Sequence, residues 1–126
     1  MTKKRCKEIL RQVYESKGGT YLANGELFTI DTGYQVGVMK IAKRDLGEKD
    51  LLKLIQETFI LASLNEVCFE VCNTMFPRVG FWIDGDTIHI DLSRWIPSLE
   101  KAMKIAIINN EDSIWDWSSM ESVKTA

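Results

Sequence analysis

The sequence predicts one α+β domain, with helices packed against a mostly antiparallel sheet of about five strands. Two patterns alternate along its 126 residues: apolar side chains every three or four positions, typical of amphipathic helices, and short runs that alternate apolar and polar residues, typical of strands. The predicted order is α-β-β-α-β-β-α-β. Because the chain is long enough for one hydrophobic core and short for two, residues 1–126 are expected to form a single domain, with a loose tail at 119–126.

Residues 78–93, with the sequence RVGFWIDGDTIHIDLS, carry the strongest of these patterns. Two runs flank an Asp-Gly pair, which tight hairpin turns favour. Since side chains alternate between the two faces of a strand, one face of this hairpin is apolar and the other carries Trp82, His89 and Asp91. The apolar face is predicted to build the core and consists of Val79, Phe81, Ile83, Ile88, Ile90 and Leu92.

The segments before this hairpin predict two helices and a further pair of strands. A first helix covers residues 3–17 and ends at two glycines. A first hairpin is expected to pair strands at 26–30 and 34–41. The broad apolar face of residues 51–72 predicts a central buried helix, with a break near 63–65.

After the hairpin, the pattern predicts one more helix and one more strand. Apolar residues recur at helical intervals over residues 99–107, and Pro97 is compatible with the start of such a helix. The alternation at residues 113–118 predicts a last short strand, which completes the sheet.

The charge of the chain argues against a nucleic-acid partner. The formal net charge is −2, so no global positive field attracts a polyanion. Residues 1–17 hold six basic and two acidic side chains; a solvated helix face explains this excess, and a patch for an acidic partner is the alternative. No stretch resembles a signal-peptide core or a membrane span, and the three cysteines have no disulfide-framework spacing, so a cytoplasmic protein is expected.

Few residues are suited to metal binding or catalysis. His89 is the only histidine, which excludes a two-histidine site within one chain. It points the same way as Asp91, and a carboxylate can orient an imidazole for general-base chemistry; a structural histidine on a half-exposed face is the simpler interpretation. Cys68 and Cys72 are four residues apart on a predicted helix and fit core packing better than a zinc site. We therefore predict neither a metal nor a cofactor.

Aspartates and tryptophans make up the predicted binding surface. Two of the aspartates flank the glycine of the hairpin turn, which explains them on conformational grounds. Tryptophan is rarely wholly buried and is enriched in binding sites, although core packing with a bonded indole N–H is the alternative interpretation. The predicted protein-binding residues are Trp82, Asp84, Asp86, Trp115, Asp116 and Trp117.

Three segments of the chain also form a familiar arrangement. They are Gly18-Gly19-Thr20 followed by Thr32-Gly33-Tyr34-Gln35-Val36, the hairpin GFWIDGDTIHIDLS, and Leu99 through Asn109 to Ile114-Trp115-Asp116. The arrangement resembles small accessory proteins of bacteriophages and integrative mobile elements, in which a GW-x-D-G-x-x-x-D-S-like hairpin precedes a helix and an I-W-D or I-F-D strand. That family has no established activity, and this chain departs from it at Phe81 and in the strand that carries His89. The resemblance implies a setting in which small proteins bind host proteins, including host defence complexes.

Three hypotheses from different classes follow. The first, which we favour, is a non-enzymatic interaction protein that binds a host protein and inhibits a defence or replication factor through an acidic, tryptophan-bearing surface. The second is a small hydrolase or RNase-like enzyme that uses His89 with Asp91, Asp116 or Arg78. The third is a nucleic-acid module that uses the basic first helix, which the acidic remainder of the chain disfavours. An unpaired strand edge or the tryptophans can also support a homodimer.

Overall fold

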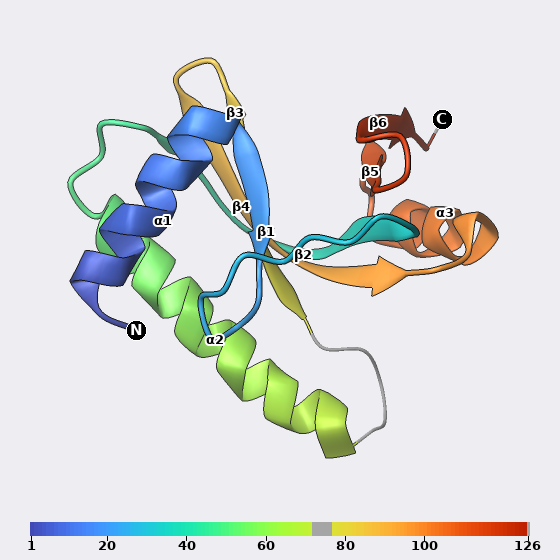
Figure 1. Cartoon of the computed structure of the whole chain (residues 1–126), viewed down its shortest axis with the longest axis horizontal. Helices are drawn as coiled ribbons and strands as arrows, with labels where there is room; N and C mark the ends of the chain where they lie inside the picture. Colours follow the sequence, from blue (N-terminus) through green and yellow to red (C-terminus); the bar gives the residue numbers. More distant parts are fainter. Residues whose placement is uncertain (72–76, 126) are drawn as a thin grey trace.

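A computed structural model of the protein describes the backbone of residues 1–71 and 77–125 and the side chains of residues 1–64 and 77–125. Three helices and six strands follow one another in this part of the chain (Figure 1). Their bounds are α1 Lys3–Ser16, β1 Gly18–Tyr21, β2 Tyr34–Asp45, α2 Leu51–Val71, β3 Arg78–Asp84, β4 Thr87–Ile96, α3 Leu99–Ile108, β5 Ser113–Asp116 and β6 Glu121–Lys124. None of these described helices has both the length and the apolar character needed to cross a membrane.

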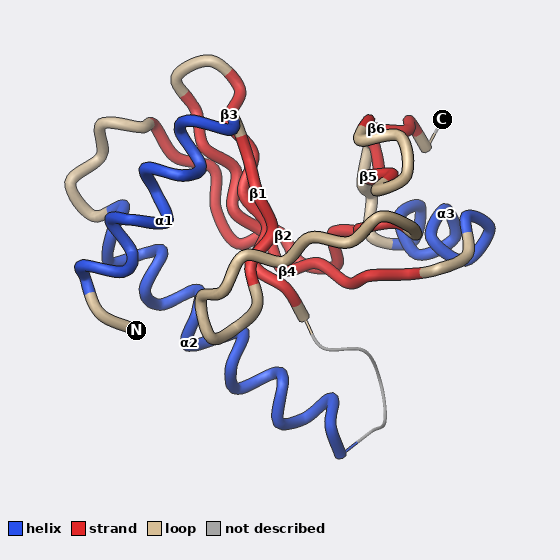
Figure 2. Tube along the Cα trace, in the orientation of Figure 1, coloured by secondary structure: helices blue, strands red, loops and turns tan. Residues whose placement is uncertain are grey.

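The strands form one antiparallel sheet in the order β1-β3-β4-β2-β5-β6. Figure 2 shows that the sheet is strongly curled, so that β5 and β6 stand apart from β1 and β3. The long strands β2 and β4 run through both parts and pair from Tyr34↔Ile96 to Asp45↔Thr87. The predicted α+β class and order of elements are therefore confirmed, and β6 adds a sixth strand.

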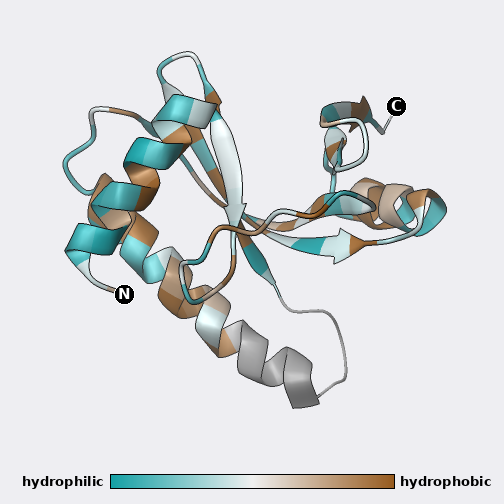
Figure 3. Ribbon diagram, in the orientation of Figure 1, coloured by the Kyte–Doolittle hydropathy of each residue, from teal (hydrophilic) through white to brown (hydrophobic). Residues whose placement is uncertain are grey.

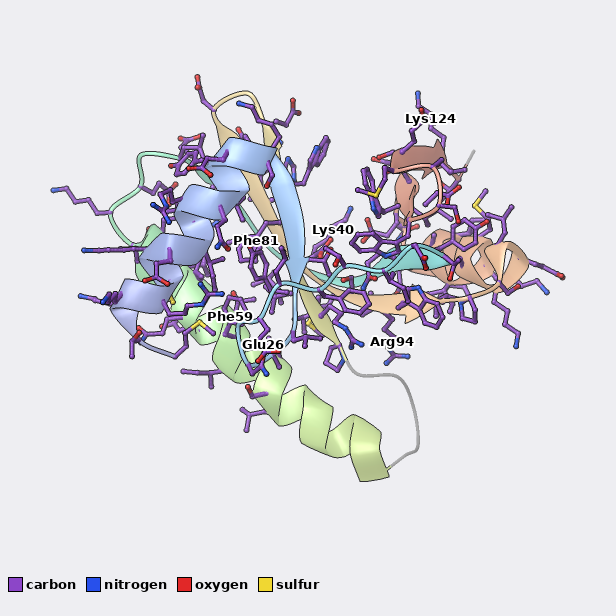
Figure 4. All side chains as sticks on the ribbon, viewed as in Figure 1. Glu26, Lys40, Phe59, Phe81, Arg94 and Lys124 are labelled. Carbon is purple, nitrogen blue, oxygen red and sulfur yellow. The ribbon has the colours of Figure 1, made fainter. Side chains whose placement is uncertain are left out.

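The larger of two hydrophobic cores lies between the helices α1 and α2 and one face of the sheet. In Figure 4, Phe59 of α2 and Phe81 of β3 lie on this side, and the two ring centroids are 6.2 Å apart. Tyr21 of β1 meets both rings edge to face. The residues of this core that are buried on α1, α2, β3 and β4 are Cys6, Ile9, Val13, Leu51, Ile55, Phe59, Ala62, Val79, Phe81, Ile83, Ile88, Ile90 and Leu92.

A second, smaller core lies at the other end of β2 and β4. There α3 packs Ala102 and Ala106 against Val36, Ile96 and Ile114. Small alanine side chains let the helix approach the strands closely, and Figure 3 shows α3 as a largely hydrophobic helix, whereas α1 carries hydrophilic and hydrophobic bands. The chain therefore builds two cores on one continuous sheet.

The hairpin at residues 78–93 forms as predicted. β3 and β4 pair from Asp84↔Thr87 to Arg78↔Ser93. Gly85 takes a φ of 60° in the two-residue turn, where a positive φ at the first position favours glycine. The six apolar residues expected in the core are all buried, which confirms the predicted assignment of faces.

The predicted first hairpin is wrong. Residues 26–30 form no strand: Leu27 alone makes an isolated bridge, to Tyr21. β1 lies earlier, at the glycines that were expected only to end the first helix, and it pairs with β3, while β2 pairs with β4 and β5. Phe28 instead meets the ring of Trp117 at 5.8 Å and the guanidinium of Arg78 at 4.6 Å. The local alternation of apolar and polar residues does not reveal strand partners that are so far apart in the sequence.

Two further expectations differ from the structure in α2. The helix is continuous through residues 63–65, and within it Ser63 Oγ donates a hydrogen bond to the Phe59 carbonyl oxygen at 3.0 Å. The helix is also not wholly buried, since the side chains of Ile60 and Leu64 are 52% and 63% exposed. One side of α2 packs on the sheet and the other faces solvent.

The sequence does not predict β6, which lies in the expected tail. Its four residues, ESVK, include one apolar side chain, Val123, which packs against the second core. The strand depends on pairing with β5, and the Thr125 hydroxyl donates to the Glu111 carbonyl oxygen at 2.8 Å just beyond it. Tertiary contacts, not local propensity, order this segment.

We expect Gly33→Ala to lower the free energy of unfolding by about 2 kcal/mol, because a non-glycine residue is strained at positive φ and the new Cβ would meet the Trp95 indole. Gly33 has a φ of 82°, and an added Cβ would lie 2.6 Å from Cε2 of Trp95. Gly47→Ala is the matched control, since nothing lies within 4 Å of a Cβ there. Urea denaturation of both variants measures the difference; equal losses would contradict this account.

Candidate functional site

The face of β3, β4 and β2 that points away from α1 and α2 carries the candidate site. We call it the outer face and define it by two rows of cross-strand neighbours: Trp82, His89 and Lys43, then Gly80, Asp91 and Lys40. Alternation along each strand places these residues opposite the first core. Figure 4 shows Lys40 on the side of β1 away from α1, in contrast to Phe59 and Phe81.

Trp82 and His89 form an aromatic pair on this face. Their ring centroids are 5.0 Å apart with an interplanar angle of 32°, and Trp82 is 58% exposed. Partial burial lowers the pKa of His89, and the nearby Lys43 lowers it further, while Asp84 acts in the opposite direction. The lowered pKa favours the neutral form of the imidazole at neutral pH. In that form the ring supports the indole as a flat, uncharged surface.

The side chain of Asp91 on β4 lies directly over Gly80 of the neighbouring strand β3. An added Cβ at Gly80 would collide with Oδ1 of Asp91 and lie 3.2 Å from its Cγ, so only glycine leaves room for this carboxyl. Oδ1 is buried and accepts no hydrogen bond from the described residues. Gly37 on β2 leaves room on the other side: an added Cβ would lie 3.2 Å from Oδ2 of Asp91 and 2.9 Å from Oε1 of Glu111.

Two carboxyl groups thus share the space that a side chain at Gly37 would fill. Burial, together with the smaller influence of Glu111, raises the pKa of Asp91 to about 7, and Lys40 opposes both effects. Burial also raises the pKa of Glu111, against the influence of Lys40. Because two adjacent carboxylates repel one another, the pair favours a state that retains one proton near neutral pH. Such a pair can hold a proton or exchange it with a bound group.

The residues of the predicted binding surface fall into two separate groups. Trp82 lies at the level of Lys43, whereas Trp115 pairs with Gln35, eight residues earlier on β2. Two of the predicted aspartates, Asp84 and Asp86, lie near Trp82 at the β3–β4 turn and are exposed. The structure therefore does not join the two predicted groups into one surface.

The two tryptophans of the second group, Trp115 and Trp117, pack against other residues of the protein. Trp117 is 6% exposed, and its indole N–H donates to Oε1 of Gln35 at 3.2 Å. Gln35 in turn donates to the hydroxyl of Ser93 at 2.9 Å, so each buried polar group has a partner. Trp115 is half-buried and meets Trp117 edge to face, with centroids 6.2 Å apart. Trp117 therefore shows the core packing with a bonded indole N–H that the alternative interpretation of the sequence expects, whereas Trp115 is only half-buried.

The residues proposed for hydrolysis are also spread out. His89 and Asp91 share the outer face, but Asp116 lies at the far end of the sheet, where Oδ1 accepts a hydrogen bond from the Ser118 N–H at 2.9 Å. Arg78 lies over the Phe28 ring. Among the side chains that the structure describes, no three potential ligands gather as a metal site. Cys72 and the side chain of Cys68 lie outside the described residues.

Four contributors to the site were not predicted from the sequence: Lys40, Gly37, Gly80 and Glu111. A glycine inside a strand often marks a close approach by another group, and this signal was present at both glycines. The group that approaches depends on strand register and on the connection between α3 and β5, which local patterns do not reveal.

Comparison of the chain with protein-family models, curated proteins and solved structures gives no match.

We expect Asp91→Asn to stabilise the fold near pH 8 and to flatten the pH dependence of its stability. In the unfolded chain Asp91 loses its proton near the ordinary aspartate pKa of 3.8, and in the folded chain only at about 7. The folded state therefore binds more protons between these values. Protonated Asp91 contributes its full stabilisation below the lower pKa, and this stabilisation is lost as the pH rises through the upper pKa. The total loss in the free energy of unfolding is at most about 4 kcal/mol.

The measurement is the free energy of unfolding by urea at several pH values between about 4 and 8. Asp86→Asn is the control because it removes an exposed carboxylate from the same hairpin. A parallel pH dependence in wild type and Asp91→Asn, with the same offset at every pH, would show that Asp91 does not titrate in this range.

Proposed function

We propose that the chain is a protein-binding module without catalytic activity of its own, and that the outer face around Trp82 is its contact surface. The exposure of Trp82 carries this proposal: an indole 58% exposed lies on a paired strand, supported from one side by the ring of His89. Large aromatic side chains held rigidly at a surface are the commonest centres of binding energy in protein interfaces.

The surroundings of Trp82 suit a specific interface. β3 lies between β1 and β4, so its backbone is fixed on both sides and little conformational entropy is lost when a partner binds. Lys43 and Asp84 lie beside the aromatic pair and supply opposite charges at its rim. An apolar centre with a charged rim is the usual arrangement of a protein contact site.

The resemblance to accessory proteins of phages and mobile elements supports a host protein as the partner, including a component of a defence complex. The composition and the thiol usage support an encounter in the cytoplasm. Binding to such a component would inhibit it by occupying a surface, which requires no catalytic group on this chain.

One observation favours a second function. Asp91 and Glu111 form a pair with raised pKa values, and such pairs carry out general acid–base chemistry in some hydrolases. In that case the reacting group would have to reach the pair through the space above Gly37. Oδ1 of Asp91 is buried against Gly80, so Oδ2 and Glu111 are the atoms that a substrate would meet.

We expect Trp82→Ala to lower affinity for the partner by at least about 30-fold, as hot-spot residues do, and to leave the melting temperature almost unchanged because the side chain is mostly exposed. Tagged wild-type protein captures the partner from a bacterial lysate, and calorimetry with the purified partner gives the affinities. Ile108→Ala is the matched control, since this side chain is 78% exposed on α3, away from the outer face.

Equal binding by wild type and Trp82→Ala would place the contact elsewhere. Asp91→Asn combined with Glu111→Gln separates the two functions. The binding module predicts that this double variant still captures the partner, whereas an acid–base enzyme would lose its biological effect in a variant that still binds.

A further inference from the structure

β2 has a long edge that no other described strand occupies. On one side β2 pairs with β4 along its whole length, but on its other side β5 pairs only with Tyr34 and Gln35. None of residues 37–45 is buried, whereas half of the residues of the neighbouring β4 are. We call residues 39–45 the free edge of β2. Along it, backbone groups face away from the sheet and can pair with a further strand.

The free edge adjoins the outer face. The row formed by Trp82, His89 and Lys43 crosses the sheet and stops at β2. From Ala42 to Asp45, β2 pairs with β4 in regular register, beyond the two irregularities near residues 38 and 41. A strand added here would extend the same row by one position and enlarge the surface around the aromatic pair.

The charges of the free edge identify the kind of strand that fits. Lys40 and Lys43 are exposed on the outer face, and Arg44 forms an ion pair with Glu48 at 3.3 Å. Asp45 is the one acid among residues 39–45, whereas the chain as a whole has a net charge of −2. Opposite charges on neighbouring strands stabilise pairing, so glutamates that alternate along an added strand would lie beside the two lysines.

We propose that the free edge of β2 binds an extended acidic segment of the partner protein as an added strand. The inference rests on the proposed function, since it names the contact by which that partner is held. Main-chain hydrogen bonds would supply affinity, and the lysines would select an acidic segment. Trp82 would then contact the part of the partner that crosses the outer face.

A second copy of this chain is a poorer occupant of the same edge. If two β2 strands paired with one another, each would bring Lys40, Lys43 and Arg44 toward the same residues of its neighbour. Like charges on facing strands are destabilising. The basic side chains of α1 are a poorer site for a strand, because a helix already uses its backbone hydrogen bonds internally.

The test uses two fluorescent peptides of eight residues, one alternating Glu with Thr and the other alternating Lys with Thr. We expect wild-type protein to bind the acidic peptide at least about tenfold more tightly than the basic one. Lys40→Glu with Lys43→Glu should reverse this preference. Lys4→Glu with Lys7→Glu on α1 is the control: it makes the same change of charge at exposed positions and should leave the preference intact.

Hydrogen exchange provides the second readout. The acidic peptide should slow exchange of backbone amides within residues 39–45 by about tenfold or more, since these groups gain hydrogen-bond partners.

Loss of peptide binding in the α1 variant would assign the acidic ligand to the helix and overturn the proposal. Binding without protection of residues 39–45, or no binding at all, would also overturn it and identify the lysines as protection against aggregation. Protection that depends on protein concentration without peptide would assign the edge to a second copy.

The partner captured through Trp82 separates this inference from the proposed function. If the partner binds the Lys40→Glu, Lys43→Glu variant as tightly as wild type, strand addition is excluded and the binding module stands. If Trp82→Ala binds the partner like wild type while the acidic peptide still protects residues 39–45, the edge site stands and the proposed contact at Trp82 fails.

Discussion

The antiparallel ladder between β2 and β4 is the interaction on which the rest of the structure depends. These two strands take part in both cores: Ile88, Ile90 and Leu92 of β4 pack with α1 and α2, while Ile96 of β4 and Val36 of β2 pack with α3. The elements α3, β5 and β6 meet the rest of the chain mainly through this pair. The two cores are therefore held together by backbone hydrogen bonds more than by contact between their side chains.

The irregularities in this ladder explain how one sheet serves two cores. The register shifts between Gly37 and Met39 and again between Lys40 and Ala42. Each shift inserts an unpaired residue, which bends the strand and increases its twist. The bend lets the sheet curl so that α3 packs at a different angle from α1 and α2 (Figure 1). The same bend brings the connection after α3, with Glu111, over Gly37 and beside Asp91.

The sequence predicted what local patterns determine and missed what distant pairing determines. The hairpin at 78–93, its turn and its two faces depend on neighbouring residues, so alternation and the Asp-Gly pair were sufficient. The strand at 26–30 and the absence of β6 were errors of the other kind, because β1, β2 and β6 find their partners through tertiary contacts. Long-range pairing of this kind also slows folding.

The candidate site was predictable to the same extent as the fold. The position of Trp82 on the outer face follows from alternation within one strand, whereas the burial of Trp117 depends on its contact with Gln35 of β2.

The carboxyl pair is not explained by the requirements of folding alone. A buried Asp91 that must retain a proton costs stability at neutral pH, and an apolar residue at that position would avoid the cost. Lys40 links this pair to the free edge, since it neighbours Asp91 in register, lies at the edge and lowers the pKa of that carboxyl. An acidic strand paired with Lys40 would weaken this effect and favour the protonated form of Asp91. Occupation of the edge and the charge of the buried pair would thus be coupled through one lysine.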